Sequence, residues 1–174
     1  MKINCQIDGN PYSIIANADK PLNLILQERS ESYCINNSCL HSECGNCLII
    51  FNQMCIPACL IPAFKANGAN IQTFEGFRKT RFYHDIERTY AKLGISPCRQ
   101  CYPSKTLLIE FLISRLDKIS VSFTQSKDKE QNLSHEFIKR EMSINKCECL
   151  DLMQIEKIVQ TAYEYRRRRS VKKH

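Results

Sequence analysis

The sequence has no continuous apolar run near the roughly 18 residues that a membrane-spanning helix requires. Its opening, MKINCQIDGN, also lacks the basic start and apolar stretch of a secretory signal. We therefore expect a cytoplasmic protein that does not bind a membrane, in a compartment where thiols stay reduced.

The chain also has little net charge outside its C-terminal end, and no internal repeat. The formal net charge is +7, but six positive charges lie in the last nine residues and leave a net +1 for the rest. They come from Arg166, Arg167, Arg168, Arg169, Lys172 and Lys173. A basic tail can bind nucleic acid or an acidic partner. No aromatic residues interleave this one, so we expect a solvated, frayed end and no nucleic-acid partner.

Cysteine, by contrast, is abundant: eleven of the 174 residues are cysteine. In a reducing compartment this number indicates metal ligation or redox chemistry more than disulfide bonds. An odd count also leaves at least one cysteine outside any set of intrachain disulfides. The length allows one generous domain or two small ones, and two small domains would each have a lean core that metal binding helps to stabilise.

The first 77 residues are expected to form a small mixed α/β unit. Two strand-like runs, KINCQI and YSIIA, flank Asp8-Gly9-Asn10 and predict a β-hairpin. A short helix is expected in PLNLILQER, with Pro21 in its first turn. The runs CLIIF and MCI predict two more strands on either side of Asn52-Gln53, CLIPAFKA a turn or two of helix, and NIQTFEGF a last strand.

Residues 78–174 show longer helical periods and are expected to be all helical. We expect one helix over residues 82–92, and a buried one from Pro103 onward because LLIEFLISRL is apolar on nearly every side. Ser134 is a candidate N-cap for a helix in HEFIKREM, after a loop-like stretch, SFTQSKDKEQN. The last helix has an apolar face made of Leu152, Ile155, Ile158 and Val159.

Four cysteines of the first unit have the spacing of a plant-type 2Fe-2S site, CxxxxCxxC in CLHSECGNC and a more distant fourth ligand. They are Cys39, Cys44, Cys47 and Cys59. Three thiolates on one loop can wrap a flat two-iron core, and inward-pointing backbone amides offset the negative charge. Gly45 fits a loop whose backbone must approach the inorganic core. Zinc or chance clustering is the alternative.

Four more cysteines lie in the helical half, as CRQC and CEC. They are Cys98, Cys101, Cys147 and Cys149. Each pair directly precedes an expected helix, where the helix dipole and the free amides favour anionic sulfur. Two helix N-termini that face each other would hold the four thiolates between them. Such a set suits a 2Fe-2S cluster or a structural zinc ion, and spacing alone leaves both open.

The remaining cysteines and the histidines have no ligand pattern. We expect Cys5, Cys34 and Cys55 to be buried or idle thiols. His41 lies inside the first cysteine loop, but four cysteines already complete that site, so we expect a plain loop residue. Surface positions are expected for His84, His135 and His174.

With both sets placed, the chain resembles the small iron-sulfur subunits of the molybdenum hydroxylases, the family of the xanthine dehydrogenase and carbon monoxide dehydrogenase small subunits. The likeness is carried by PLNLILQER, CLHSECGNC, ACLIPAFKANGANIQTFEGF, CRQCYPS and MSINKCECLDLMQIEKIV. It implies an α+β fold: a ferredoxin-like (β-grasp) domain at residues 1–77, then an all-α four-helix domain at residues 78–174 with the basic tail. It also implies one 2Fe-2S cluster in each domain.

The resemblance implies a function as well. The chain would be the electron-transfer subunit of an oxidoreductase complex and would have no substrate site of its own. Electrons would pass from a molybdenum-pterin centre on a large subunit, through the cluster of the helical domain and then that of the ferredoxin-like domain, to FAD on a medium subunit or to another acceptor. The alternative is a zinc-stabilised binding module whose basic tail contacts nucleic acid or an acidic partner.

Five positions near the expected ligands depart from the pattern of the family that the chain resembles. Leu40 stands where that family has glycine or aspartate, and Pro97 where it commonly has a glutamine that touches the pterin. Arg99 and Gln100 replace a glycine and an aromatic residue, and Glu148 replaces the arginine of CRC. These changes leave ligation possible and alter the surroundings of the second cysteine set.

Overall fold

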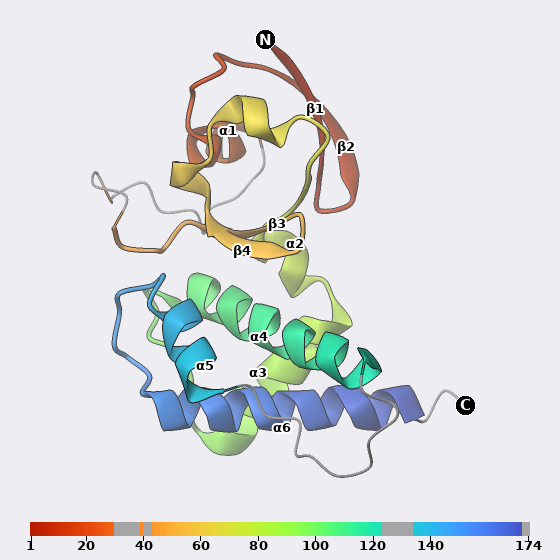
Figure 1. Ribbon diagram of the computed structural model, residues 1–174, viewed down its shortest axis with the longest axis vertical. Coiled ribbons are helices and arrows are strands. Elements are labelled where there is room, and N and C mark those ends of the chain that lie inside the picture. The colour runs from red at the N-terminus through yellow and green to blue at the C-terminus, as the bar shows by residue number, and fades with distance from the viewer. Residues whose placement is uncertain (30–38, 40–42, 123–133, 172–174) are drawn as a thin grey trace.

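The computed structural model describes residues 1–29, 39, 43–122 and 134–171. Its N-terminal half is built on a five-stranded sheet in the order β2-β1-β5-β3-β4 (Figure 1). The strands are β1 (Lys2–Ile7), β2 (Asn10–Ile15), β3 (Leu48–Phe51), β4 (Met54–Pro57) and β5 (Asn70–Gln72). β1 runs parallel to β5, and the other neighbours are antiparallel. The short helix α1 (Leu22–Arg29) begins one residue after the predicted Pro21 and supplies buried side chains to the core of this half.

Both predicted hairpins are present, and each closes with a two-residue turn. Asp8 and Gly9 have φ values of 52° and 81°, the left-handed conformation that a tight hairpin turn requires. Asn52 and Gln53 adopt the same conformation without glycine, at φ 46° and 70°. The side chain of Asn52 accepts a hydrogen bond from the backbone N–H of Asn70 at 2.8 Å, which ties this turn to β5.

Strand β3 is apolar throughout because it faces two cores. Leu48 and Ile50 pack with the helical half, whereas Ile49 and Phe51 pack with the core under α1. Successive side chains of a strand point to opposite faces, so a strand covered on both sides reads as a continuous apolar run. The central sheet therefore joins the two halves of the molecule.

The predicted last strand is wrong at its C-terminal end. β5 stops at Gln72, and Thr73 caps a short helix, α2 (Phe74–Arg78). Asp8 fixes this change of direction, since its carboxylate accepts 2.7 Å hydrogen bonds from the backbone N–H and the hydroxyl of Thr73. A Cβ on Gly76 would lie 2.0 Å from that carboxylate, which explains the glycine in TFEG. The expected helical turns in CLIPAFKA are two 3₁₀ helices, Ala58–Leu60 and Ala63–Ala66.

The C-terminal half is helical, as the sequence predicts. Its helices are α3 (Arg81–Leu93), α4 (Tyr102–Ser122), α5 (His135–Met142) and α6 (Leu152–Val171). Ser134 caps α5 by accepting the backbone N–H of Phe137 at 3.2 Å. The loop predicted in SFTQSKDKEQN lies, from residue 123 on, outside the described residues. Within the described part of the chain, no helix is long and apolar enough to cross a membrane.

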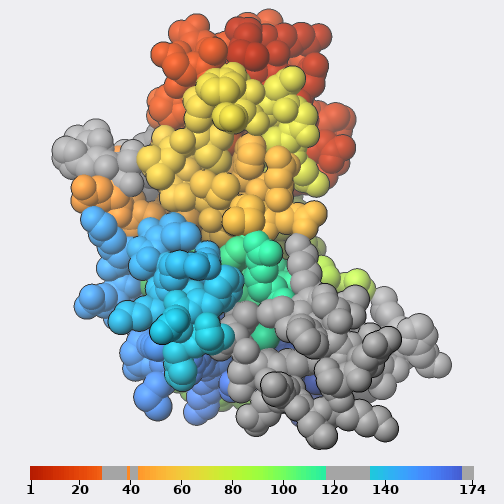
Figure 2. All heavy atoms as spheres, viewed as in Figure 1, coloured from red at the N-terminus to blue at the C-terminus, as the bar shows by residue number. Residues whose placement is uncertain are grey.

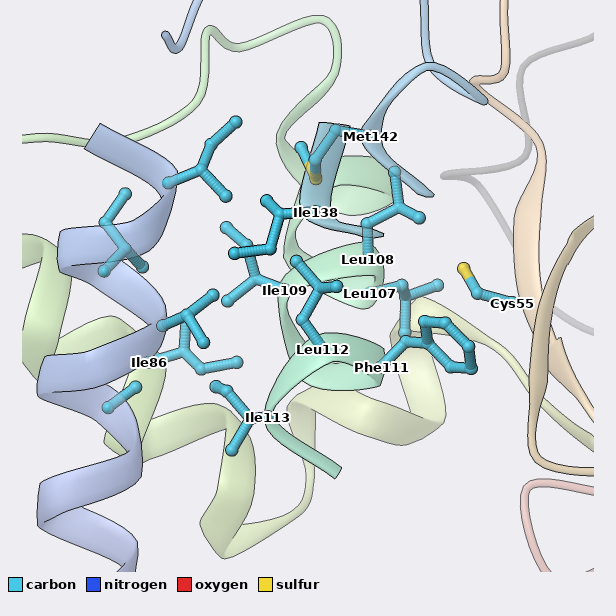
Figure 3. Packing of buried hydrophobic residues seen from close by; sticks show 14 of the residues in the cluster. Cys55, Ile86, Leu107, Leu108, Ile109, Phe111, Leu112, Ile113, Ile138 and Met142 are labelled. Atoms are coloured by element: carbon cyan, nitrogen blue, oxygen red, sulfur yellow. The ribbon is translucent and has the colours of Figure 1, made fainter. Parts of the chain in front are cut away.

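Helix α4 is surrounded by the rest of the molecule, which explains its apolar sequence. In Figure 3, Ile109 and Ile113 point toward α6, and Leu107 and Phe111 point toward the sheet, where Cys55 lies. Leu107, Ile109 and Ile113 are each 0% exposed. Because α4 contacts β3 and β4 as well as α3, α5 and α6, it is the element that holds the helical half against the sheet.

The prediction of a frayed basic end is wrong for the residues up to Val171. α6 continues through the arginines, and the side chain of Arg166 is 7% exposed and pairs with Glu110 of α4. Its guanidinium also lies 4.4 Å from the ring centroid of Phe82. Arg169 pairs with Asp85 of α3 at 2.6 Å. A stripe of positive charge thus meets acidic side chains of two neighbouring helices, so half of the arginine run belongs to the packed structure.

Candidate metal centres

The structure brings the four cysteines of the helical half together. Their sulfur atoms all lie within 4.8 Å of one another. Cys98 is 3.2 Å from Cys101 and 3.8 Å from Cys147, and Cys101 is 3.1 Å from Cys149, all measured between sulfurs. We call this set, Cys98, Cys101, Cys147 and Cys149, the inner site.

Two helix beginnings place the inner site, as expected. Cys101 directly precedes α4, and its carbonyl accepts the backbone N–H of Lys105 at 2.9 Å. Cys147 and Cys149 lie in the loop before α6. Asp151 and Gln154 cap the start of this helix, since the side chain of each accepts the backbone N–H of the other. The backbone N–H of Cys98 donates to the sulfur of Cys149 at 3.4 Å, so one inward-pointing amide already serves the sulfur set.

Without a cation, the four thiols of the inner site resist ionising together. Hydrogen bonds from Cys101, through its thiol and its backbone, lower the pKa of Cys98 to about 7. Burial, and then the neighbouring thiols, raise the pKa of Cys101 well above its usual range. Burial also raises the pKa of Cys147. One thiolate is therefore favoured over four, and a bound metal supplies the positive charge that deprotonates the rest.

The four cysteines of the N-terminal half, all on described residues, do not lie in one such close group and form a looser second set. We call Cys39, Cys44, Cys47 and Cys59 the outer site. Backbone N–H groups of Glu43 and Cys44 donate to the sulfur of Cys39 at 3.3 and 3.4 Å, and that of Asn46 donates to Cys44 at 3.4 Å. These amides give the loop the inward-pointing donors that a negatively charged sulfur centre needs.

Two cysteine pairs are recognisable within the outer site. The backbone N–H of Ala58 donates to the carbonyl of Cys47 at 2.9 Å, which places the following residue, Cys59, beside Cys47. Burial, and then contact with the Cys59 thiol, raise the pKa of Cys47 to about 12. Burial, and then contact with the Cys39 thiol, raise the pKa of Cys44. Two pairs of thiols suit two metal atoms, one for each pair.

Donor chemistry at both sites fits iron-sulfur ligation, since each offers four cysteine sulfurs together with backbone amides. The inner site also fits zinc. Four Zn–S bonds of about 2.3 Å span a tetrahedron with edges of about 3.8 Å, close to the separation between Cys98 and Cys147. Geometry therefore gives the place of the candidate ligands, and metal analysis distinguishes the metals.

The loops that carry the two sites meet across the junction between the halves, a contact that sequence reasoning missed. Asn145, two residues before Cys147, is 3% exposed. Its side-chain N–H groups donate to the carbonyl of Gly45 at 3.1 Å and to the side chain of Asn46 at 2.8 Å. Its side-chain oxygen accepts the backbone N–H of Cys147 at 3.2 Å. Figure 2 shows the orange segment before β3 next to the blue loop between α5 and α6. The sequence signalled only the local part of this arrangement, because an asparagine side chain often accepts the backbone N–H two residues further on.

The departures from the pattern of the resembling family lie at the edge of the inner site. Arg99, Gln100 and Glu148 are exposed, whereas Pro97 is buried. Exposed charged and polar side chains thus lie next to the inner-site cysteines in sequence. Leu40 is outside the described residues.

The other cysteines and histidines lie away from the two sites or outside the described residues. Cys5 and Cys55 are buried, and burial raises the pKa of both thiols, which keeps them protonated. His84 and His135 are exposed and pair with glutamates. Three expectations concern residues that the structure does not describe, Cys34, His41 and His174.

Comparison with known proteins supports the same view of the chain. It is 28% identical to one component of the nicotinate dehydrogenase of Pseudomonas putida KT2440 over 169 residues, which cover 95% of this chain and 97% of that protein. It is also 28% identical to the xanthine dehydrogenase iron-sulfur-binding subunit of Escherichia coli O157:H7 over 84% of each chain. No protein-family model matches.

The solved structures agree on the fold. A chain of quinoline 2-oxidoreductase from Pseudomonas putida 86 superposes with a TM-score of 0.71 at 20% identity, over 97% of this chain and 96% of that one. This likeness confirms an N-terminal ferredoxin-like sheet followed by a helical domain. On these comparisons the chain is similar to the small iron-sulfur subunits of the molybdenum hydroxylases, and the resemblance inferred from its cysteine motifs is confirmed.

Proposed function

We propose that this chain is the electron-transfer subunit of a xanthine dehydrogenase-like molybdenum hydroxylase and carries one 2Fe-2S cluster at each of its two sites. The observation that carries the proposal is the four-cysteine group of the inner site, together with the two cysteine pairs of the outer site. They lie in a chain similar over 84% of its length to the iron-sulfur-binding subunit of a xanthine dehydrogenase. A single set would suit many small metal-binding domains. Two sets joined at one junction suit a chain that relays electrons.

The residues of this chain would bind and orient the clusters. Cys98, Cys101, Cys147 and Cys149 would hold one cluster, and Cys39, Cys44, Cys47 and Cys59 the other. A 2Fe-2S cluster accepts and releases single electrons, at a potential set by net charge, hydrogen bonds to sulfur and exposure. The backbone N–H groups that reach Cys39, Cys44 and Cys149 stabilise the negatively charged sulfurs.

We place the partners of the complex on either side of this relay. A large subunit with a molybdenum-pterin centre would contact the inner site, around Arg99 and Glu148, and a medium subunit with FAD would contact the outer site. Two exposed apolar residues, Leu60 next to Cys59 and nearby Phe64, suit a protein contact at the outer site. We also propose a cytoplasmic location, where eleven cysteines would stay reduced and available to iron, and a division into residues 1–77 and 78–174.

Iron and acid-labile sulfide analysis of anaerobically purified protein tests the proposal. The expected result is two 2Fe-2S clusters' worth of iron and sulfide per chain, with a visible absorption spectrum. Stoichiometric zinc without sulfide would refute it and favour a zinc-stabilised binding module. Substitution of Cys101, the buried ligand of the inner site, by serine should then lower the iron content by one cluster.

A further inference from the structure

We propose that Asn145 is a positioning residue that fixes the inner site against the outer site and provides the bonded connection between them. The inference rests on the proposed function, because it assigns a role in the relay to a residue that ligates no metal. Its basis is a single buried side chain whose hydrogen bonds reach the ligand loops of both sites.

Each polar atom of the Asn145 side chain is used. The nitrogen donates to Gly45 and Asn46, the two residues between the outer ligands Cys44 and Cys47. The oxygen accepts the backbone N–H of the inner ligand Cys147. A buried amide satisfied on both sides is costly to replace, because loss of either partner leaves a buried polar group without a hydrogen bond.

The backbone at this junction is packed too closely to tolerate a side chain at Gly45. A Cβ there would lie 2.0 Å from the carbonyl oxygen of Ile144 and 2.7 Å from the Cα of Asn145. Gly45 also has φ +67°, a conformation that glycine adopts readily. Two independent features, a hydrogen-bonded amide and a close backbone approach, therefore hold the same pair of loops together.

These contacts form a continuous bonded route between the sites. It runs from Cys44 along the backbone to the carbonyl of Gly45, across the amide of Asn145, and into the backbone of Cys147, with two hydrogen bonds of 3.1 and 3.2 Å. The transfer that it would serve moves one electron: one site is oxidised by one electron and the other reduced by one. No bond forms or breaks, and no proton moves.

A neighbouring contact provides the matched control. Lys146 pairs with Glu43 at 2.9 Å across the same junction, but the two side chains are 65% and 67% exposed. An exposed ion pair contributes little to stability and is screened by salt. Lys146→Ala therefore removes a contact between the same loops without touching the buried amide.

The test compares the full chain in three variants, Asn145→Ala, Asn145→Ser and Lys146→Ala, with the wild type. Serine can still accept the N–H of Cys147 but is too short to reach Gly45. The serine variant therefore removes the hydrogen bond between the two loops and keeps the one within the loop of Asn145. Four quantities are measured. They are the iron and sulfide content, the electron paramagnetic resonance signal of each reduced cluster, the splitting of those signals caused by coupling between the two clusters, and the rate of electron transfer between the clusters after flash reduction.

We expect each cluster's own signal to persist in Asn145→Ser, while the splitting decreases and the transfer slows. Lys146→Ala should match the wild type in all four measurements. A residue with only a structural role would alter stability and leave the splitting of intact clusters unchanged. Asn145→Ala should show the same changes as serine, with a melting temperature lowered by on the order of 5 °C.

The outcomes separate this inference from the proposed function. A wild-type protein with zinc and no sulfide overturns both. A wild-type protein with two clusters, and an Asn145→Ser variant with unchanged splitting and rate, overturn the inference alone. Loss of the inner cluster in both Asn145 variants also overturns it, because the role of Asn145 would then lie within its own loop.

Discussion

Replacing Arg166 by alanine should destabilise the protein far more than its place in a basic C-terminal run indicates. The side chains of Arg166 and Glu110 are 7% and 12% exposed, and they join α6 to α4. Alanine would leave the carboxylate of Glu110 buried with this ion pair broken, and it would also remove the guanidinium from the ring of Phe82.

The expected cost follows from the burial of the pair. Removal of one partner of a buried ion pair costs about 3–5 kcal/mol, because the other charge stays desolvated. For a chain of this length, that cost corresponds to a fall in melting temperature of roughly 6–20 °C.

Arg168 is the matched control, since it pairs with Glu164 at 3.5 Å on a surface where the side chains are 73% and 61% exposed. Arg168→Ala should cost less than about 0.5 kcal/mol.

Chemical unfolding followed by circular dichroism measures both variants on metal-loaded protein. A double variant, Arg166→Met with Glu110→Leu, should recover most of the lost stability, because it removes both buried charges together. If Arg166→Ala were as stable as Arg168→Ala, the pair would be solvated in solution, and the packing of the arginine run described above would be wrong.

Substitutions at Cys44, Gly45 and Asp8, two of them with a matched control, test the sites and the fold. Cys44→Ser should abolish or alter the spectroscopic signal of one cluster and leave the other, and simultaneous loss of both would contradict two separate sites. Gly45→Ala should lower the free energy of unfolding by at least about 2 kcal/mol, because strain at positive φ adds to a backbone clash. Gly68→Ala is the control: Gly68 has φ +76° and nothing within 4 Å of an added Cβ, so this variant should show the cost of the strain alone. Asp8→Ala should lower the free energy of unfolding by about 3 kcal/mol, because it leaves the buried Thr73 without its acceptor and places alanine at positive φ. Asp8→Asn keeps a side-chain oxygen and tolerates that φ, so it should cost less in the same unfolding assay.

Local chemistry made much of the fold predictable. The Asp8-Gly9 and Asn52-Gln53 turns, the Ser134 cap and the apolar helix after Pro103 are all where the sequence placed them. The failures share one cause. The end of β5 and the packed arginines depend on partners distant in sequence, Asp8 for Thr73 and Glu110 for Arg166, and no local pattern names such a partner.

The cysteine spacing predicted two sets of candidate ligands, and the structure brings four of these cysteines, Cys98, Cys101, Cys147 and Cys149, together. What spacing could not predict is how the sets relate to each other. Asn145 and Gly45 are a hundred residues apart, and neither a lone asparagine nor a lone glycine signals a contact at that separation. Their pairing arises only in the folded chain.

The sequence by itself determined the candidate ligand types, their proposed grouping into two sets of four, and the order of an α/β half before a helical half. These features follow from residue identity and short-range periodicity, which a chain carries before it folds. Only the tertiary structure decided which surfaces meet: α4 buried against β3 and β4, Arg166 and Arg169 paired with neighbouring helices, and two sulfur loops joined through one buried amide. Those outcomes depend on burial and on partners brought together by folding, because a charge or an amide acquires its role only when water is excluded around it.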